Sequence, residues 1–230
     1  ALLSRSLGEH KFKEANKIGV NAAFLYFLSY LVFLILGFTV VKPFYASQIK
    51  GADAEIMEMG IEYLRTVMIF SFGLLAQIYF ERLLTSTGKT LFSMTSQLCG
   101  ALTNIILDPI MIFGLLGCPA MGVTGAAVAT VIGQCVAAVV AFTCNHKFNT
   151  EIKIHFQGFR PDIKIIGTIY AIGVPSIIMQ SIGSVMTYSM NRILIAFSST
   201  ATAVFGVYFK LQSFFLSLIH ISEPTRLQLI

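Results

Sequence analysis

Long apolar stretches alternate with short polar segments along this sequence. Residues 18–41 contain no charged side chain, and neither do residues 165–191. A helix needs about 20 mostly apolar residues to cross the hydrocarbon layer of a membrane. The pattern therefore predicts an all-α, polytopic transmembrane bundle of about six spanning helices, at residues 18–41, 63–82, 91–113, 125–144, 165–191 and 201–219.

The polar breaks predict how the chain is organised. Glycines and Pro119 interrupt the apolar stretch after residue 113 and predict a hairpin there. The longest polar break, residues 145–164, is expected to be a cytoplasmic linker between two helical groups, 1–144 and 165–216. Residues 217–230 resemble translated sequencing-adapter read-through, so we expect them to be a non-native tail.

Composition and charge support a membrane location. Charged residues make up 12% of the chain, whereas soluble domains carry about 25%. The net charge of +5 comes from short basic clusters and not from one continuous face, which argues against nucleic-acid binding. Basic residues concentrate in every second connection between the apolar stretches, which predicts that these connections are cytoplasmic in a bacterial cell. They are Arg5, Lys11, Lys13, Lys17, Arg82, Lys89, Lys147, Lys153, Arg160 and Lys164.

Asp108 is the most informative polar position. A carboxylate within an apolar run is costly and usually faces a cavity or a partner. Asn104 lies one helical turn earlier, and Pro109 follows directly and predicts a bend. Amide and carboxylate oxygens in this setting suit Na⁺ or a proton. The alternative is that Asp108 is a wetted structural group near the outer end of its helix.

Small residues recur every fourth position in the next helix, at Gly125, Ala129 and Gly133. Such a stripe favours close packing against another helix. Thr130 lies beside the stripe and could add its hydroxyl oxygen to Asn104 and Asp108.

Polar and thioether side chains after Pro175 suggest a second feature. Gln180 and Tyr188 could line a substrate cavity, and Met179 suits a promiscuous apolar cavity because thioethers repack easily. Packing or lipid contact is the alternative for each of them.

The sequence contains no nucleotide-binding loop of the GxxxxGK[ST] kind, and its cysteines and histidines show no metal-ligand spacing. We therefore expect no enzyme activity, no cofactor, and no metal beyond a possible Na⁺ at Asp108. Coupling to a Na⁺ or H⁺ gradient is the simplest remaining energy source.

Several motifs together resemble the multidrug and toxic compound extrusion (MATE) family of transporters. They are LSRSLGE at residues 3–9, FERLLTSTGKT at 80–90, NIILDPI at 104–110, GAAVATVIGQ at 125–134, GVPS at 173–176 and FKLQSF at 209–214.

The resemblance implies part of a twelve-helix protein with two six-helix lobes around a central V-shaped cavity. This chain would hold the rear part of the first lobe, helices three to six, then the lobe linker, helix seven and part of helix eight. In the family, an Asn and an Asp four residues apart on helix five, with a Thr on helix six, contribute to a cation site. These match Asn104, Asp108 and Thr130.

This chain departs from the family pattern at two acids. The first-helix acid found in many members would precede residue 1. The glutamate that some members carry on helix seven is missing from residues 165–191.

The resemblance implies an antiporter of the bacterial cytoplasmic membrane that exports cationic, amphiphilic, drug-like compounds in exchange for Na⁺ or H⁺. The full-length protein would be a monomer surrounded by membrane lipid. A lipid-linked oligosaccharide flippase of the same superfamily is the nearest alternative, and a membrane-embedded enzyme is the alternative from another class.

Overall fold

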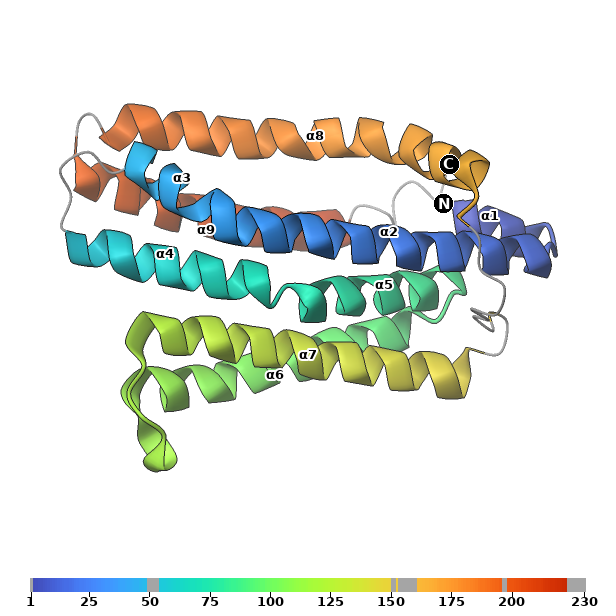
Figure 1. The fold of residues 1–230 in the computed structure, drawn as a ribbon, viewed down its shortest axis with the longest axis horizontal. Helices are drawn as coiled ribbons and strands as arrows, with labels where there is room; N and C mark the ends of the chain where they lie inside the picture. The colour runs from blue at the N-terminus through green and yellow to red at the C-terminus, as the bar shows by residue number, and fades with distance from the viewer. Residues whose placement is uncertain (1, 49–53, 150–151, 153–160, 196–197, 223–230) are drawn as a thin grey trace. The chain divides into compact units, whose positions relative to one another are not determined.

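The computed structural model describes residues 2–48, 54–149, 152, 161–195 and 198–222. All regular structure among these residues is helical (Figure 1). The elements are α1 (Leu2–Gly8), α2 (Phe12–Thr39), α3 (Val41–Gln48), α4 (Ala54–Ile69), α5 (Phe72–Ser86), α6 (Thr90–Phe113), the 3₁₀ turn η1 (Leu115–Gly117), α7 (Gly122–Phe148), α8 (Ile163–Ile195) and α9 (Ser199–Ser222).

The all-α, membrane-spanning class predicted from the sequence is confirmed. In the described part of the chain, α2, α6, α7 and α8 are each long and apolar enough to span a membrane. The pair α4 and α5 passes the same test when taken together. The described residues therefore contain four or five candidate spans, where the apolar pattern predicted about six. The span predicted at residues 201–219 falls in α9 and extends beyond the residues that could be tested, so it stays a prediction.

The helix predicted at residues 63–82 is two helices in the structure. It breaks between Ile69 and Phe72, where the axes of α4 and α5 differ by 47°. At the break the Ser71 N–H donates to the Met68 carbonyl, one residue nearer than the spacing within an α-helix. Residues 70 and 71 carry no Pro or Gly, so the apolar pattern alone could not locate the break.

The chain divides into two compact units, Ala1–Gly167 and Thr168–Ile230. The boundary lies within α8, a few residues after the predicted linker, and the assignment of the units to two lobes stays a prediction. Residues 223–230 of the predicted tail lie outside the described part, whereas residues 217–222 continue α9.

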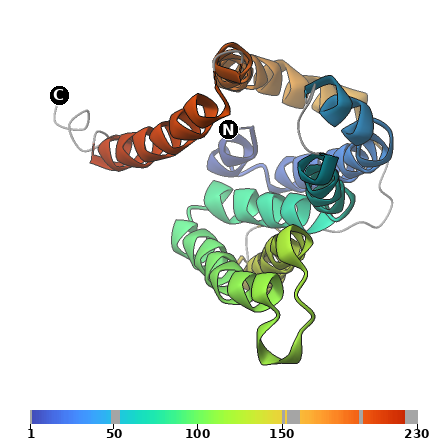
Figure 2. The ribbon, with the colours of Figure 1, turned by 90° about the vertical axis from the view of Figure 1, so that its left-hand side faces the viewer.

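In the first unit, α6 and α7 form an antiparallel hairpin, and α5 packs against α7 (Figures 1 and 2). Gly114, with φ of 74°, ends α6 in the left-handed conformation that glycine adopts most easily. The hairpin predicted from the glycines is therefore confirmed.

Small residues set the distance between α6 and α7. A methyl group on Gly133 would lie 2.9 Å from the Gly100 carbonyl oxygen, and one on Gly125 would lie 2.5 Å from the Met111 carbonyl oxygen. Ala129, between these glycines, is fully buried. The packing role predicted for the Gly125, Ala129 and Gly133 stripe is confirmed.

A second contact region joins α2 to α5 near their cytoplasmic ends, as the positive-inside pattern orients them. Tyr79 and Leu83 of α5 form a buried cluster with Ile152, and the Tyr79 hydroxyl donates to the Gly19 carbonyl at 3.0 Å. The predicted linker also contacts this region, because the Asp162 N–H donates to Asn21 Oδ1 at 3.0 Å.

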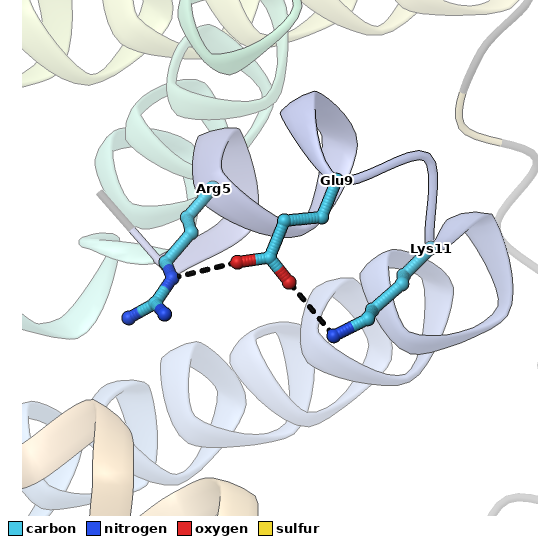
Figure 3. A network of polar contacts seen from close by, with 3 residues as sticks. All are labelled: Arg5, Glu9 and Lys11. Atoms are coloured by element: carbon cyan, nitrogen blue, oxygen red, sulfur yellow. Dashed lines mark hydrogen bonds and ion pairs between the residues drawn. The ribbon is translucent and has the colours of Figure 1, made fainter.

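The connection between α1 and α2 carries an exposed charge network (Figure 3). Arg5 Nε donates to Glu9 Oε1 at 2.9 Å, and Lys11 Nζ donates to Glu9 Oε2 at 2.7 Å. The hydrogen bond from Lys11 is the main cause that lowers the pKa of Glu9 below its ordinary value, followed by the one from Arg5.

Candidate cation site

The three residues proposed from the sequence as cation ligands lie together. The Asn104 side-chain amide donates to Asp108 Oδ1 at 3.3 Å and to Thr130 Oγ1 at 3.4 Å. Both bonds are longer than the usual 2.9–3.0 Å. The Thr130 hydroxyl donates its own hydrogen to the Ala126 carbonyl at 2.9 Å, so its oxygen lone pairs face the Asn104 amide. All three residues are half-buried.

The local fold explains this meeting. Asn104 and Asp108 are one turn apart on α6, so they share a helical face. Gly133 on α7 lets that face approach, because a methyl group there would lie 3.2 Å from Asn104 Cβ. Thr130 lies one turn from Gly133 and so meets Asn104. The helix α6 continues through Pro109 to Phe113.

A cavity of about 300 Å³ adjoins the site between α5, α6 and α7. Asn104 and Thr130 line it, and Asp108 is not among its lining residues. Its other polar side chains are Gln77, Gln97 and Gln134. The Gln134 Oε1 atom is buried and has no hydrogen-bond partner among the described residues. A water molecule or an ion in the cavity could satisfy this oxygen.

Glu81, on α5, is a second polar centre that the sequence interpretation missed. Its side chain is buried, with the residue 7% exposed. Its carboxylate accepts hydrogen bonds from Gln77 Nε2 at 2.9 Å, Ser96 Oγ at 3.1 Å and Gln97 Nε2 at 2.9 Å.

The burial of Glu81 was missed because the sequence predicted that its helix ends next to it. The predicted helix ended at residue 82, which would have left Glu81 at the water interface beside Arg82. In the structure α5 continues to Ser86, so Glu81 lies inside the helix. The available signal in the sequence was the spacing of one helical turn between Gln77 and Glu81, which places both polar side chains on the same face of the helix.

The residues predicted for the substrate cavity lie in the second unit, on α8. Met179 is 73% exposed, Tyr188 is 48% exposed, and Gln180 is also exposed. A cavity of about 440 Å³ between α8 and α9 has other lining residues, among them Met190, Phe205 and Tyr208. Neither the cation-binding role of the first group nor the substrate role of this group is tested by the geometry, and both stay predictions.

The described ranges contain no group of three or more His, Cys, Asp or Glu side chains arranged to hold a metal ion. The oxygen atoms at Asn104, Asp108 and Thr130 are instead the kind of set that binds a monovalent cation or a proton.

Comparisons with known proteins agree on one family. The MatE family model matches residues 1–110. The multidrug export protein MepA of Staphylococcus haemolyticus is 26% identical over 214 residues, which cover 92% of this chain and 46% of that protein. MepA of Staphylococcus aureus is 26% identical over 166 residues, which cover 72% of this chain and 36% of that protein.

Solved structures extend the likeness to the fold. An inward-facing multidrug resistance MATE transporter of the MOP superfamily matches with a TM-score of 0.81 and 26% identity, over 92% of this chain and 47% of that one. A MOP superfamily transporter from Pyrococcus furiosus matches with a TM-score of 0.79 and 25% identity, over 92% of this chain and 46% of that one.

These matches cover about nine-tenths of this chain but only about half the length of each relative. The relatives are transporters and not enzymes, and the Staphylococcus relatives together with the apolar helices agree with a multi-pass protein of a bacterial cytoplasmic membrane. The resemblance seen in the motifs is confirmed: the comparisons find that this chain is similar to membrane transporters of the MATE family.

Proposed function

We propose that this chain is part of a secondary active antiporter that exports small, cationic, amphiphilic organic compounds in exchange for Na⁺ or H⁺. The supporting observation is the Asn104, Asp108 and Thr130 cluster beside a cavity with polar lining in an otherwise apolar bundle. Export of drug-like compounds agrees with the names of the MepA relatives.

The chemistry follows from the cost of a charge in apolar surroundings. An ionised Asp108 needs a positive partner, because desolvation penalises an isolated carboxylate strongly. Na⁺ bound by the carboxylate, the Asn104 oxygen and the Thr130 oxygen would meet that need, and so would a proton on Asp108. The departure of the ion changes the charge of the site, and this can couple ion movement to a conformational change.

Coupling requires that cargo and ion favour different conformations of the transporter. An ion can shift the conformational equilibrium only by its difference in affinity for the two states. The neutral form of Asp108 tolerates a dry environment much better than the charged form does. Binding of an ion or a proton at Asp108 can therefore control which conformation the transporter adopts. Thioether side chains such as Met179 would provide an adaptable apolar surface for varied cargo.

The test uses membrane vesicles that contain the natural transporter carrying this sequence. Uptake of a fluorescent organic cation is measured while a Na⁺ gradient and a pH gradient are imposed separately. We expect one of the gradients to drive transport, and we expect Asp108→Asn to abolish the response while the protein remains in the membrane.

Asp162→Asn is the matched control, because Asp162 lies at the start of α8 and accepts a hydrogen bond from the Lys164 N–H. Its response should stay close to that of the unmodified transporter. Transport that responds to neither gradient would contradict the antiport proposal. Undiminished transport by Asp108→Asn would remove Asp108 from the mechanism.

A further inference from the structure

Glu81 is a buried acid without a positive partner in the described part of the chain. It forms no ion pair there, and its three hydrogen-bond partners are the neutral side chains of Gln77, Ser96 and Gln97. Three neutral donors offset only part of the cost of burying a full negative charge. A proton on Glu81 would remove that cost.

The charged and titratable groups nearby do not supply the missing positive charge. Neither α5 nor the helices packed against it, α1, α2, α6 and α7, contribute a charged group that hydrogen-bonds to or ion-pairs with Glu81 among the described residues. The groups on these helices are Arg82, Tyr79, Arg5, Lys13, Glu14, Lys17, Tyr26, Tyr30, Asp108, Cys99, Cys135, Cys144, His146 and Lys147. Lys89, in the turn between α5 and α6, donates instead to the Phe148 carbonyl.

Ser96 makes both protonation states of Glu81 possible. Its hydroxyl oxygen lies 3.1 Å from Glu81 Oε1 and 2.8 Å from the Ser93 carbonyl oxygen, but a hydroxyl has only one hydrogen to donate. When the hydroxyl donates to Glu81, it stabilises the carboxylate. When it donates to Ser93, its lone pair can accept a hydrogen bond from a protonated Glu81. Ser96 is fully buried, so water does not compete for this hydrogen.

Glu81 is connected to the proposed cation site through one cavity. Gln77 and Gln97, which bond to Glu81, line the same cavity as Asn104 and Thr130. On α6 the positions 97, 100, 104 and 108 recur every three or four residues and therefore share one face. Glu81 and Asp108 thus lie toward opposite ends of one polar strip, about 16 Å long between Gln97 and Asp108 at 1.5 Å per residue.

We propose that Glu81 is a second proton-binding site within the membrane, on the cytoplasmic side of the Asn104, Asp108 and Thr130 cluster. The carboxylate takes a proton from water to form the neutral acid, which then donates a hydrogen bond to Ser96, and it returns the proton to water when it ionises. Proton binding at Glu81 is independent of transport; its role in coupling rests on the proposed function.

The experiment measures the carboxylic-acid C=O stretch by infrared difference spectroscopy on the purified chain in lipid nanodiscs, between alkaline and acidic pH. We expect a carboxylic-acid band that is lost in Glu81→Gln and retained in Asp108→Asn. Glutamine at position 81 can still bond to Gln77 and Gln97, and circular dichroism confirms that the variant keeps its helices.

A second pair of variants tests the hydrogen bonds. Gln97→Leu removes a hydrogen-bond donor to the Glu81 carboxyl group, so the C=O stretch frequency of its band should shift. Gln134→Leu is the matched control, because Gln134 lines the cavity but forms no hydrogen bond to Glu81 among the described residues, and the band of this variant should not move.

A difference spectrum that Glu81→Gln leaves unchanged would overturn the proposal, since Glu81 would then keep one protonation state. Equal shifts in Gln97→Leu and Gln134→Leu would also overturn it. These outcomes are separate from the vesicle assay, which can fail for Asp108 while the Glu81 band is present.

Discussion

The Gln97 side chain on α6 donates a hydrogen bond to Glu81 on α5 across 2.9 Å, although the two residues are 16 positions apart. The turn between the helices makes this contact possible: Gly88, with φ of 76°, reverses the chain within a few residues. Because Gln97 also lines the cavity between α5, α6 and α7, this one bond joins the buried acid to the space beside Asn104.

Gly133→Ala should destabilise the α6 and α7 hairpin. The added methyl group would meet the Gly100 carbonyl oxygen at 2.9 Å, and backbone cannot move aside as a flexible side chain can. We expect a loss of about 1–3 kcal/mol of stability, measured by thermal unfolding in detergent. Gly19→Ala is the control, because no described residue lies within 4 Å of a methyl group there, and alanine favours the helix. Equal melting temperatures for the two variants would contradict the close-packing interpretation.

Thr130→Ala should weaken the response of transport to the coupling ion. The variant removes one oxygen from the Asn104 and Asp108 cluster but leaves the carboxylate in place. The ion concentration for half-maximal transport should rise roughly 5-fold, as expected for the loss of one interaction of about 1 kcal/mol. Thr143→Ala on the same helix is the control, since in the described part of the chain the Thr143 hydroxyl bonds only to the Val139 carbonyl. An unchanged ion dependence in Thr130→Ala would remove Thr130 from the site.

Tyr79→Phe should loosen the contact between α2 and α5. The hydroxyl group is buried and bonds to the Gly19 carbonyl at 3.0 Å, whereas the ring remains packed on Tyr26 and Phe80 in the variant. The expected loss of stability is about 1 kcal/mol. Hydrogen exchange of the α2 amides near Gly19 is the measurement, and exchange as slow as in the unmodified chain would show that this bond adds nothing.

The Glu9 network should give a small dependence of stability on pH. Because Lys11 and Arg5 lower the pKa of Glu9, its contribution is complete above the ordinary glutamate pKa and is lost as the pH falls through the lowered value. The melting temperatures of the unmodified chain and of Glu9→Gln should therefore converge in acid. They should also converge at high salt, because the network is exposed and screened. A difference that persists in both conditions would rule out an electrostatic cause.

The apolar pattern was most informative where helices are long and their ends are marked. The helix expected at residues 91–113 is Thr90–Phe113, because Gly114 and the following hairpin residues end it sharply. The meeting of Asn104 with Asp108 and Thr130 followed from helical spacing and from small residues that bring two helices together.

The sequence was least informative where tertiary contacts determine the outcome. The break after Ile69 has no Gly or Pro at residues 70 and 71 to mark it, and the burial of Glu81 depends on partners from another helix. A carboxylate beside an arginine at an apparent helix end is indistinguishable from an ordinary solvated pair until the neighbouring helix is placed.

The 47° break between α4 and α5 has a mechanical consequence. A continuous helix transmits torque along its whole length through its hydrogen-bond ladder, whereas a broken one bends at the joint. The helix α4, where Glu62 accepts a hydrogen bond from Thr124 on α7, can therefore tilt separately from α5. The helix α5 stays bonded to α6 through Glu81 and Ser96. The two parts of such a broken crossing can change their tilt separately.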